Sequence, residues 1–378
     1  MKHMILSIIL TLSTLVTPAC SGDGKIQVEN QPAAKIDWDI AADNATKSLT
    51  RHFWNSSMGY FNYLPDKEDG LEYALSYWPQ AHAMDVVIDA YLRTGDDSYK
   101  SFFDKWFTGI KFKSNGSYYN TFYDDMEWIC LTMLRLYDVT RENKYLDTAK
   151  DLWEDIKTGW NLQGGGGIAW RKDQLWSKNA CSNGPAGIIA ARLYRISKDA
   201  DDLQWAKDIF EWEYDHLYEP STGRIYDNID TRTGERKDWC FTYNQGTFLG
   251  LAHELWQLTA EKIYLITAMK AATFTTSSDL CVSDKVLRNE GNGDGGLFKG
   301  IFVRYLTLLI QDDGLTASES KRFSSFLERC ATTLWNDGCN DHDNPLFGPD
   351  WASPDGTVDL GTQVSGAALL EAMSVLKK

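Results

Sequence analysis

Two adjacent carboxylates, Asp124 and Asp125, are the residues of this chain whose type and spacing point most directly to chemistry. They open a predicted helix that runs to about Arg141. An Asp at a helix start often has a structural task, because its oxygen accepts hydrogen bonds from free backbone N–H groups and its charge suits the positive end of the helix dipole. One Asp satisfies that need, so a catalytic role and a capping role both remain open for the pair.

The helix behind the pair is apolar almost all round, with side chains such as Trp128, Leu131 and Leu134 on every face. A helix without a polar face is buried on all sides. The two carboxylates therefore lie where a central helix emerges into a cavity, and isolated charges are costly in such a place.

Similar polar turns follow several of the apolar helical segments: Thr94–Tyr99, Thr140–Tyr145, Thr259–Tyr264 and a longer version at Ser197. The helix after each turn has apolar positions at intervals of three and four with charges between them, which is typical of a helix that faces solvent. An apolar helix paired with an amphipathic one, repeated roughly every 45 to 60 residues, indicates a helical repeat.

This repeat predicts an all-α fold: a single (α/α)6 barrel of six inner and six outer helices that occupies residues 37–378. The inner helices are expected near Trp78–Arg93, Asp124–Thr140, Asn179–Ile196, Phe241–Thr259, Leu297–Ile310 and Asp359–Leu376. The outer helices are expected near Ile40–Trp54, Ser98–Phe112, Asn143–Lys157, Ala200–Tyr218, Glu261–Thr276 and Thr316–Trp335.

Inner helices of such a barrel are parallel, so their N-terminal ends share one mouth. Polar and aromatic residues lead into all six of these ends: Tyr77–Gln80, Tyr123–Asp125, Lys178–Gly184, Thr242–Gly246, Asp294–Lys299 and Asp359–Gln363. Six positive dipole ends at one opening favour anionic groups such as the Asp pair. We therefore expect the functional site at this mouth.

Residues 1–19 have a basic start, a short apolar run and a small-residue end, which is typical of a signal peptide. The Cys20 that follows Ala19 resembles the lipidated cysteine of bacterial lipoproteins, although Thr17 replaces the usual Leu. Residues 20–36 are polar and suit a flexible tether. We expect an exported bacterial lipoprotein, periplasmic or at the cell surface, that is held to a membrane through Cys20.

Charge and cysteine spacing exclude several classes of protein. Loss of residues 1–19 removes one Lys, which takes the formal charge from −15 to −16, so nucleic acid is not an expected partner. The remaining cysteines lack the spacing of a zinc site. Cys330 and Cys339 are the nearest pair for a disulfide, whereas Cys130 and Cys181 are expected as buried free thiols. Residues 289–294 and 337–343 lack the ligand spacing of a calcium loop, so no metal or cofactor is expected.

The chain is rich in aromatic residues, with 15 Trp and 18 Tyr. Sugar-binding clefts use such rings as stacking platforms. The run Gly164–Gly167 stands before Trp170 and Trp176 and lacks the context of a phosphate-binding loop. A flexible loop that closes aromatic rings over a chain-like ligand fits it better.

Five motifs in this order resemble glycoside hydrolase family 76, the bacterial endo-α-1,6-mannanases, over roughly Ile40 to the C-terminus. The motifs are Tyr123–Trp128, Gly165–Ile168 with Trp170, Asn179–Pro185, Thr242–Gly246 and Phe298–Tyr305. The resemblance implies an (α/α)6 barrel without a metal that hydrolyses α-1,6-mannosidic bonds in mannan with retention. It implies Asp124 as nucleophile and Asp125 as acid/base. Where the family often has two Trp after the glycines, this chain has Ala169 and Trp170.

The residues are consistent with that chemistry, because a retaining glycosidase needs two carboxyl groups about 5 to 5.5 Å apart with opposite pKa tuning. The expected partner is α-1,6-linked mannan or its oligosaccharides, bound by a monomer. The candidate substrate-binding residues at the mouth are Trp78, Gln80, Trp170, Asn183, Asp227, Tyr243, Asn244, Gln245 and Lys299.

Other classes remain open. A glycan-binding lipoprotein without catalysis would keep the rings and the barrel, but would have no need of both Asp. A helical-repeat adaptor would place its special residues along an exposed concave surface. Another (α/α)6 enzyme such as a uronate lyase is the main rival, and it would need cations at the mouth, where the sequence offers few beyond Lys178 and Lys299.

Overall fold

The computed structural model describes residues 35–377, and Ile36 onward forms one compact unit. The predicted signal peptide, the lipidation site Cys20 and nearly all of the predicted tether lie outside the described residues. Twelve α-helices make up the described part of the chain: α1 (Trp38–Phe53), α2 (Pro79–Thr94), α3 (Lys100–Gly109), α4 (Tyr123–Thr140), α5 (Asn143–Lys157), α6 (Gly184–Ser197), α7 (Ala200–His216), α8 (Thr242–Thr259), α9 (Lys262–Ser277), α10 (Asp294–Ile310), α11 (Ala317–Asn336) and α12 (Leu360–Leu376).

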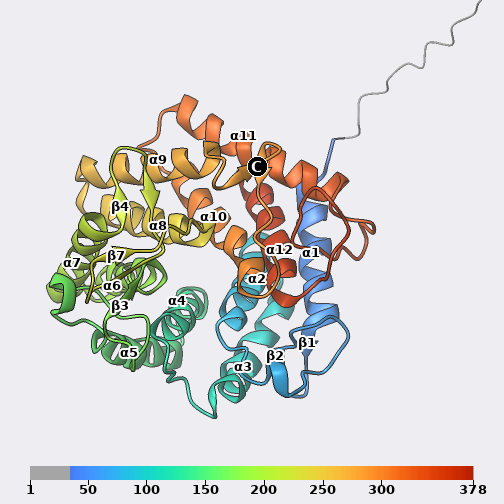
Figure 1. Ribbon diagram of the computed structural model, residues 1–378. Coiled ribbons are helices and arrows are strands. Elements are labelled where there is room, and N and C mark those ends of the chain that lie inside the picture. The colour runs from blue at the N-terminus through green and yellow to red at the C-terminus, as the bar shows by residue number, and fades with distance from the viewer. Residues whose placement is uncertain (1–34, 378) are drawn as a thin grey trace, which may run out of the picture. The chain divides into compact units, whose positions relative to one another are not determined.

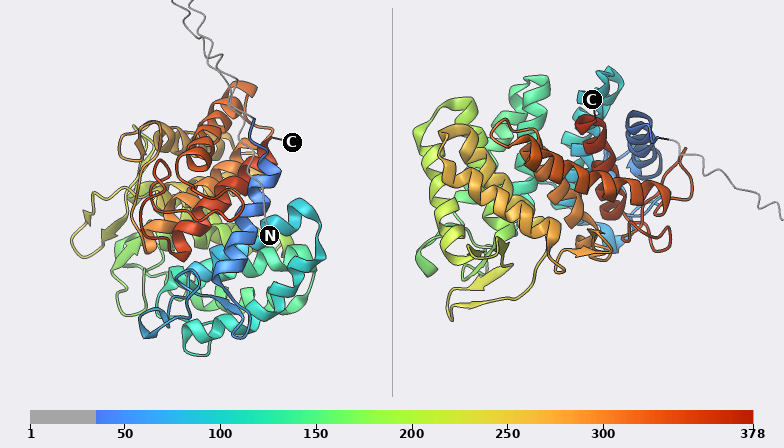
Figure 2. Two further views of the ribbon diagram at one scale, coloured as in Figure 1. Left: turned by 90° about the vertical axis from the view of Figure 1, so that its right-hand side faces the viewer. Right: turned by 90° about the horizontal axis from the view of Figure 1, so that it is seen from above.

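The even-numbered helices form a closed inner ring, in which α2 packs on α4, α4 on α6, α6 on α8, α8 on α10, α10 on α12 and α12 again on α2. The odd-numbered helices pack outside them. In Figures 1 and 2 the first helix, α1 (blue), lies beside the last, α12 (red). The predicted (α/α)6 barrel is confirmed.

The inner helices are buried over most of their length, as their all-round apolar sequences predict; α12, for example, is buried from Leu360 to Ser374. The outer α5 instead buries one stripe, which includes Leu146, Trp153 and Ile156. Several boundaries differ from expectation by one to three residues, and one differs by more. The helix predicted to start at Asn179 starts at Gly184, because Asn179 pairs with Asn228 in a short sheet and Pro185 fixes the first turn.

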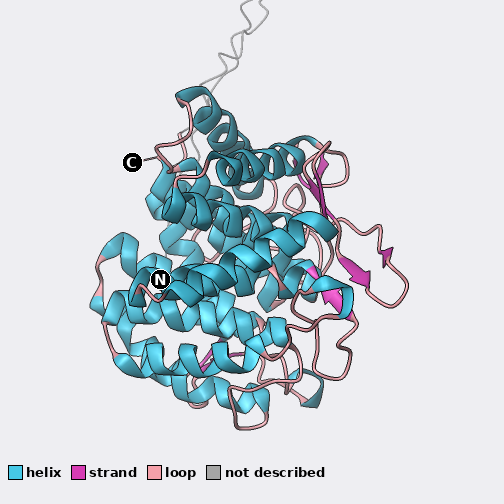
Figure 3. Ribbon diagram, turned by 90° about the vertical axis from the view of Figure 1, so that its left-hand side faces the viewer, coloured by secondary structure: helices cyan, strands magenta, loops and turns pink. Residues whose placement is uncertain are grey.

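Short strands occupy the connections that lead from an outer helix to the next inner helix (Figure 3). All pairings are antiparallel, and β3, β6 and β7 form one sheet in the order β3-β6-β7. The strands are β1 (Trp54–Asn55), β2 (Tyr60–Phe61), β3 (Ser177–Asn179), β4 (Tyr218–Glu219), β5 (Arg224–Ile225), β6 (Asn228–Asp230), β7 (Glu235–Arg236), β8 (Val282–Ser283) and β9 (Val286–Leu287). These long connections surround the N-terminal ends of the inner helices.

The connections at the opposite end are tight, and their geometry explains the repeated sequence. Each of α2, α4, α6 and α8 ends in a residue with left-handed backbone: Gly95, Arg141, Lys198 and Ala260. The Thr or Ser before it donates its hydroxyl to the carbonyl four residues back and accepts the N–H two residues ahead, as Thr140 does with Leu136 and Glu142. The polar turns are therefore helix C-caps that reverse the chain within a few residues.

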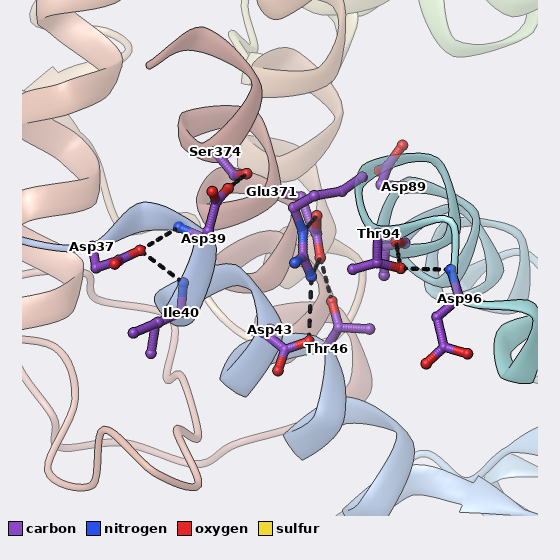
Figure 4. A network of polar contacts seen from close by, with 12 residues as sticks. Asp37, Asp39, Ile40, Asp43, Thr46, Asp89, Thr94, Asp96, Glu371 and Ser374 are labelled. Carbon is purple, nitrogen blue, oxygen red and sulfur yellow. Dashed lines mark hydrogen bonds and ion pairs between the residues drawn. The ribbon is translucent and has the colours of Figure 1, made fainter. Parts of the chain in front are cut away.

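Ion pairs bind the inner ring together at this end, where a cavity of about 900 Å³ is lined by residues from the C-terminal halves of all six inner helices. Arg304 of α10 and Arg135 of α4 both bind Asp89 of α2. Arg93 of α2 donates to Glu371 of α12 at 2.8 Å, and Thr46 of α1 donates to the same carboxylate at 2.7 Å (Figure 4). Arginines here also suit the negative dipole ends of six helices.

The six described cysteines are free thiols, and the pair in contact is Cys240 with Cys281, whose sulfurs are 3.6 Å apart. The pair that is nearest in sequence, Cys330 and Cys339, is not joined. Between residues 35 and 377, no helix is long and apolar enough to cross a membrane.

The left-handed caps give a test of the fold. Gly95→Ala puts a methyl group at φ 66° without any atom within 4 Å, so we expect only the backbone cost, roughly 1 kcal/mol less unfolding free energy. Ala260→Gly, at φ 58°, should stabilise by a similar amount. Urea unfolding measures both. Ala317→Gly in right-handed α11 is the control and should lower the unfolding free energy. A lower unfolding free energy in Ala260→Gly as well would contradict the left-handed cap at this position.

Candidate functional site

A cleft of about 660 Å³ opens at the N-terminal ends of α2, α4, α8 and α10, which is a usual size for a small-ligand site. Aromatic rings and carboxylates dominate its wall. The lining residues are Tyr63, Leu71, Glu72, Tyr73, Leu75, Ser76, Trp78, Pro79, Phe122, Asp124, Asp125, Trp128, Trp170, Tyr243, Asp294 and Phe298.

Asp124, in the first turn of α4, accepts three hydrogen bonds. Its Oδ2 accepts from the indole Nε1 of Trp170 at 3.2 Å and from the thiol of Cys181 at 3.3 Å. Its Oδ1 accepts from the backbone N–H of Asp125 at 3.1 Å. These three donors, two of them from the connection between α5 and α6, stabilise the ionised carboxylate.

Asp125 has a poorer set of partners. Among the described residues, its carboxylate accepts one hydrogen bond, from the Asn120 side-chain amide at 3.1 Å. The negative charges of Asp124 and Asp294 also disfavour the ionised form of Asp125.

These surroundings separate the two pKa values. Burial raises the pKa of Asp124, and the hydrogen bonds from Cys181, Asp125 and Trp170 oppose that rise. Burial raises the pKa of Asp125 well above its ordinary value, and the charges of Asp124 and Asp294 add to the rise. The surroundings therefore favour ionisation of Asp124 over that of Asp125, which is the kind of difference that separates a nucleophile from a general acid.

The segment between α5 and α6 brings Trp170 to Asp124. The backbone N–H of Tyr123 donates to the Trp170 carbonyl at 2.9 Å, so the start of α4 and this segment are joined directly. The glycines before Trp170 are explained by packing: a Cβ on Gly166 or Gly167 would lie 2.6 Å from the ring of Trp160 or Trp212. The expected flexible loop is thus a segment packed against two Trp rings.

Three of the side-chain amides that were predicted to bind sugar instead form hydrogen bonds with the backbone. Gln80 accepts from the Phe61 N–H and donates to the Phe61 carbonyl, both at 2.8 Å. Gln245 makes the same pair of bonds with Ile225, and Asn183 with Ile168. All three are fully buried and absent from the cleft wall. We therefore do not retain them as substrate-binding candidates.

Lys299, Asp227 and Asn244 also lie outside the cleft wall. The ammonium group of buried Lys299 donates to the Pro349 carbonyl at 2.6 Å. Asn244 donates to Asp227 at 2.8 Å, and both are buried. Burial raises the pKa of Tyr243 well above its ordinary value, and the charges of Cys181 and Asp227 add to the rise. Asp227 and Asn244 therefore lie behind Tyr243 rather than in the wall.

Trp78, Trp170 and Tyr243 do line the cleft, and Tyr243 stacks on Phe298 with ring centroids 3.9 Å apart. Sequence reasoning missed Cys181, which was expected only as a buried thiol, and Asp294, which lay within a recognised mouth segment without being selected. It also missed the wall formed by Tyr63 to Ser76, a connection without helical periodicity whose aromatic residues are its only signal.

Glu127, one turn behind Asp124, is not a rival for the acid role. It is fully buried, and neither of its oxygens has a hydrogen-bond partner among the described residues. Burial raises its pKa well above the ordinary value. It does not line the cleft.

The fold is an (α/α)6 barrel, and the two Asp carboxyl groups at its mouth differ in their affinity for a proton. Together these features define a carbohydrate-active hydrolase. The sequence profile of glycosyl hydrolase family 76 matches residues 37–378, and the chain belongs to this family of glycoside hydrolases.

The chain resembles solved structures closely. The GH76A α-1,6-mannanase of Salegentibacter sp. HEL1_6, in complex with α-1,6-mannotetrose, is 42% identical, with a TM-score of 0.86 over 90% of this chain and 100% of that chain. The Lin0763 protein from Listeria innocua is 33% identical, with a TM-score of 0.81 over 90% of this chain and 98% of that chain.

A curated relative, the mannan endo-1,6-alpha-mannosidase DCW1 of Saccharomyces cerevisiae, is 25% identical over 256 residues. The match covers 63% of this chain and 56% of the yeast protein. The chain thus spans little more than half the length of this relative.

Trp170→Phe tests the hydrogen bonds on Asp124. The variant keeps the ring beside Phe122 but loses the N–H donor, so the ionised form of Asp124 is less stable and its pKa rises. We expect the acid limb of the kcat/KM profile to move up by roughly one pH unit. Trp176 is not part of the cleft wall, so Trp176→Phe should leave the acid limb of the kcat/KM profile at the wild-type pH. A limb that stays fixed in Trp170→Phe would contradict the role of this donor.

Proposed function

We propose that this chain is a retaining endo-α-1,6-mannanase in which Asp124 is the nucleophile and Asp125 the acid/base, without a metal ion. The observation that carries the proposal is the unequal environment of the two adjacent carboxylates: three donors on Asp124, and one donor with two nearby negative charges on Asp125.

The Salegentibacter enzyme supports this assignment. Its inactive variants, in which two consecutive aspartates are replaced by Ala or by Asn, were solved with α-1,6-mannotetrose and α-1,6-mannotriose. Asp124 and Asp125 are a consecutive pair in this chain, placed in the cleft.

The charge of the cleft favours a neutral sugar over a uronate. Among the described lining residues there are four carboxylates, Glu72, Asp124, Asp125 and Asp294, and no Lys, Arg or His. Lys178 and Lys299, the cations that a lyase would need, are buried and donate to backbone carbonyls. An anionic substrate would be repelled.

The mechanism follows from the two environments. Asp124 attacks the anomeric carbon while Asp125 gives its proton to the glycosidic oxygen, and the bond to the leaving mannan breaks. Asp125, now ionised, then takes a proton from water, whose oxygen displaces Asp124 from the sugar. Two inversions give net retention, and aromatic rings such as Trp170 supply apolar faces for the pyranose.

The stereochemistry and two variants test the roles. Proton NMR of the first product should show the α anomer; a β product would overturn retention.

Asp125→Ala should lose about 10²- to 10⁴-fold of its rate on mannan, keep more rate on an aryl mannoside, and form a mannosyl azide of retained configuration when azide is added. Asp124→Ala should be inactive on both substrates. Azide rescue of Asp124→Ala with retention would mean exchanged roles. Asp138→Ala, at the far end of the same helix, is the control.

We also propose that the mature protein is a monomer anchored to a membrane by acylation of Cys20. The leader before Cys20 supports this proposal. We expect the wild type to incorporate labelled fatty acid and to sediment with membranes, and Cys20→Ala to do neither. Membrane-bound Cys20→Ala would contradict the anchor.

A further inference from the structure

A third carboxylate, Asp294, lines the same cleft as the Asp pair. It is the first residue of α10, whereas the pair belongs to α4. It is exposed at the cleft rim, while Asp124 and Asp125 are partly buried.

One hydrogen bond fixes this carboxylate. The indole Nε1 of Trp78, at the start of α2, donates to Asp294 Oδ1 at 3.0 Å. The bond joins two inner helices that are not neighbours in the ring, since α12 packs between them. Trp78 itself lines the cleft, so its indole serves both as a wall and as a support for Asp294.

No described cation neutralises Asp294, which takes part in no salt bridge within residues 35–377. The titratable groups that face it are acids and phenols. Those that line the cleft are Tyr63, Glu72 and Tyr73 from the connection before α2, Asp124 and Asp125 from α4, and Tyr243 from α8. Asp359, at the start of α12, accepts a hydrogen bond from Tyr63.

We propose that Asp294 is a positioning residue that acts through Asp125: its negative charge opposes loss of the proton that Asp125 must deliver. Asp125 has few hydrogen-bond donors to stabilise an ionised form, so its proton affinity depends on nearby charge. A like charge in the same cleft makes ionisation harder. The inference rests on the proposed acid role of Asp125 and adds a residue that maintains it.

The field of Asp294 reaches both members of the pair. Burial is the main cause that raises both pKa values, and the charge of Asp294 adds a smaller rise to that of Asp125 and to that of Asp124. Removal of the charge therefore lowers both pKa values. The acid limb of the activity profile depends on ionised Asp124 and the alkaline limb on protonated Asp125, so both limbs should move to lower pH together.

The test is Asp294→Asn in the full-length protein. We expect both limbs of kcat/KM on linear α-1,6-mannan to shift down by roughly 0.5 to 1 pH unit, the size that a unit charge produces across a water-lined cleft. Asp294→Glu, which restores the charge, should restore most of the profile. Trp78→Phe keeps the charge but removes the hydrogen bond, and should lower activity without moving both limbs.

A second readout does not depend on catalysis. In protein labelled with ¹³C at the Asp carboxyl groups, the Asp125 resonance is assigned by its loss in Asp125→Asn, and its titration midpoint should be lower in Asp294→Asn. Asp313→Asn removes the same charge from an exposed site beyond the other end of α10 and is the matched control. An unchanged midpoint in Asp294→Asn, or an equal shift in Asp313→Asn, would overturn the proposal.

The activity assay on mannan and the carboxyl titration test the proposed function and the role of Asp294 separately. Wild-type protein that cleaves no α-1,6-mannan would overturn the function, while the carboxyl titration would still decide whether Asp294 controls the proton of Asp125. A mannanase whose Asp125 titrates identically with and without Asp294 would keep the function and lose the inference.

Discussion

The parallel arrangement of the six inner helices is the constraint on which the rest of the molecule depends. Parallel helices place six positive dipole ends at one opening and six negative ends at the other. The charged residues follow this polarity: Asp124, Asp125, Asp294 and Asp359 stand at the starts of inner helices, and arginines such as Arg93 and Arg195 stand in the last turns. Because the middle of each helix is buried, polar chemistry is confined to the two ends.

The difference between the two catalytic carboxylates is a property of the fold rather than of the pair. Adjacent residues on one helix share a dipole and a solvent boundary, so the contrast must come from elsewhere. It comes from Trp170 and Cys181, which both donate to Asp124, whereas Asp125 accepts from Asn120 alone among the described side chains. The connection between α5 and α6 thus supplies the donors that distinguish Asp124 from Asp125.

The sequence predicts the twelve helices well, since apolar periodicity reports burial and the Thr or Ser turns report the C-caps. It predicts the Asp pair and the rings of Trp78, Trp170 and Tyr243 at the cleft. The sequence does not show whether a side-chain amide at a helix start points into the cleft or forms hydrogen bonds with a neighbouring connection. Gln80, Gln245 and Asn183 all accept hydrogen bonds from backbone N–H groups. The role of Cys181 likewise depends on its approach to Asp124 from a distant segment, which no local pattern records.

The contact between α1 and α12 has a consequence for how the chain folds. Most helix pairs, such as α4 with α5 or α8 with α9, join segments that are close in sequence and can form early. Thr46 and Glu371, by contrast, are separated by 325 residues, and Asp39 and Ser374 by 335, so these bonds close very long loops. Ring closure is therefore a late, entropically costly step, and synthesis of the last helix sets the moment at which the barrel, and with it the cleft, becomes complete.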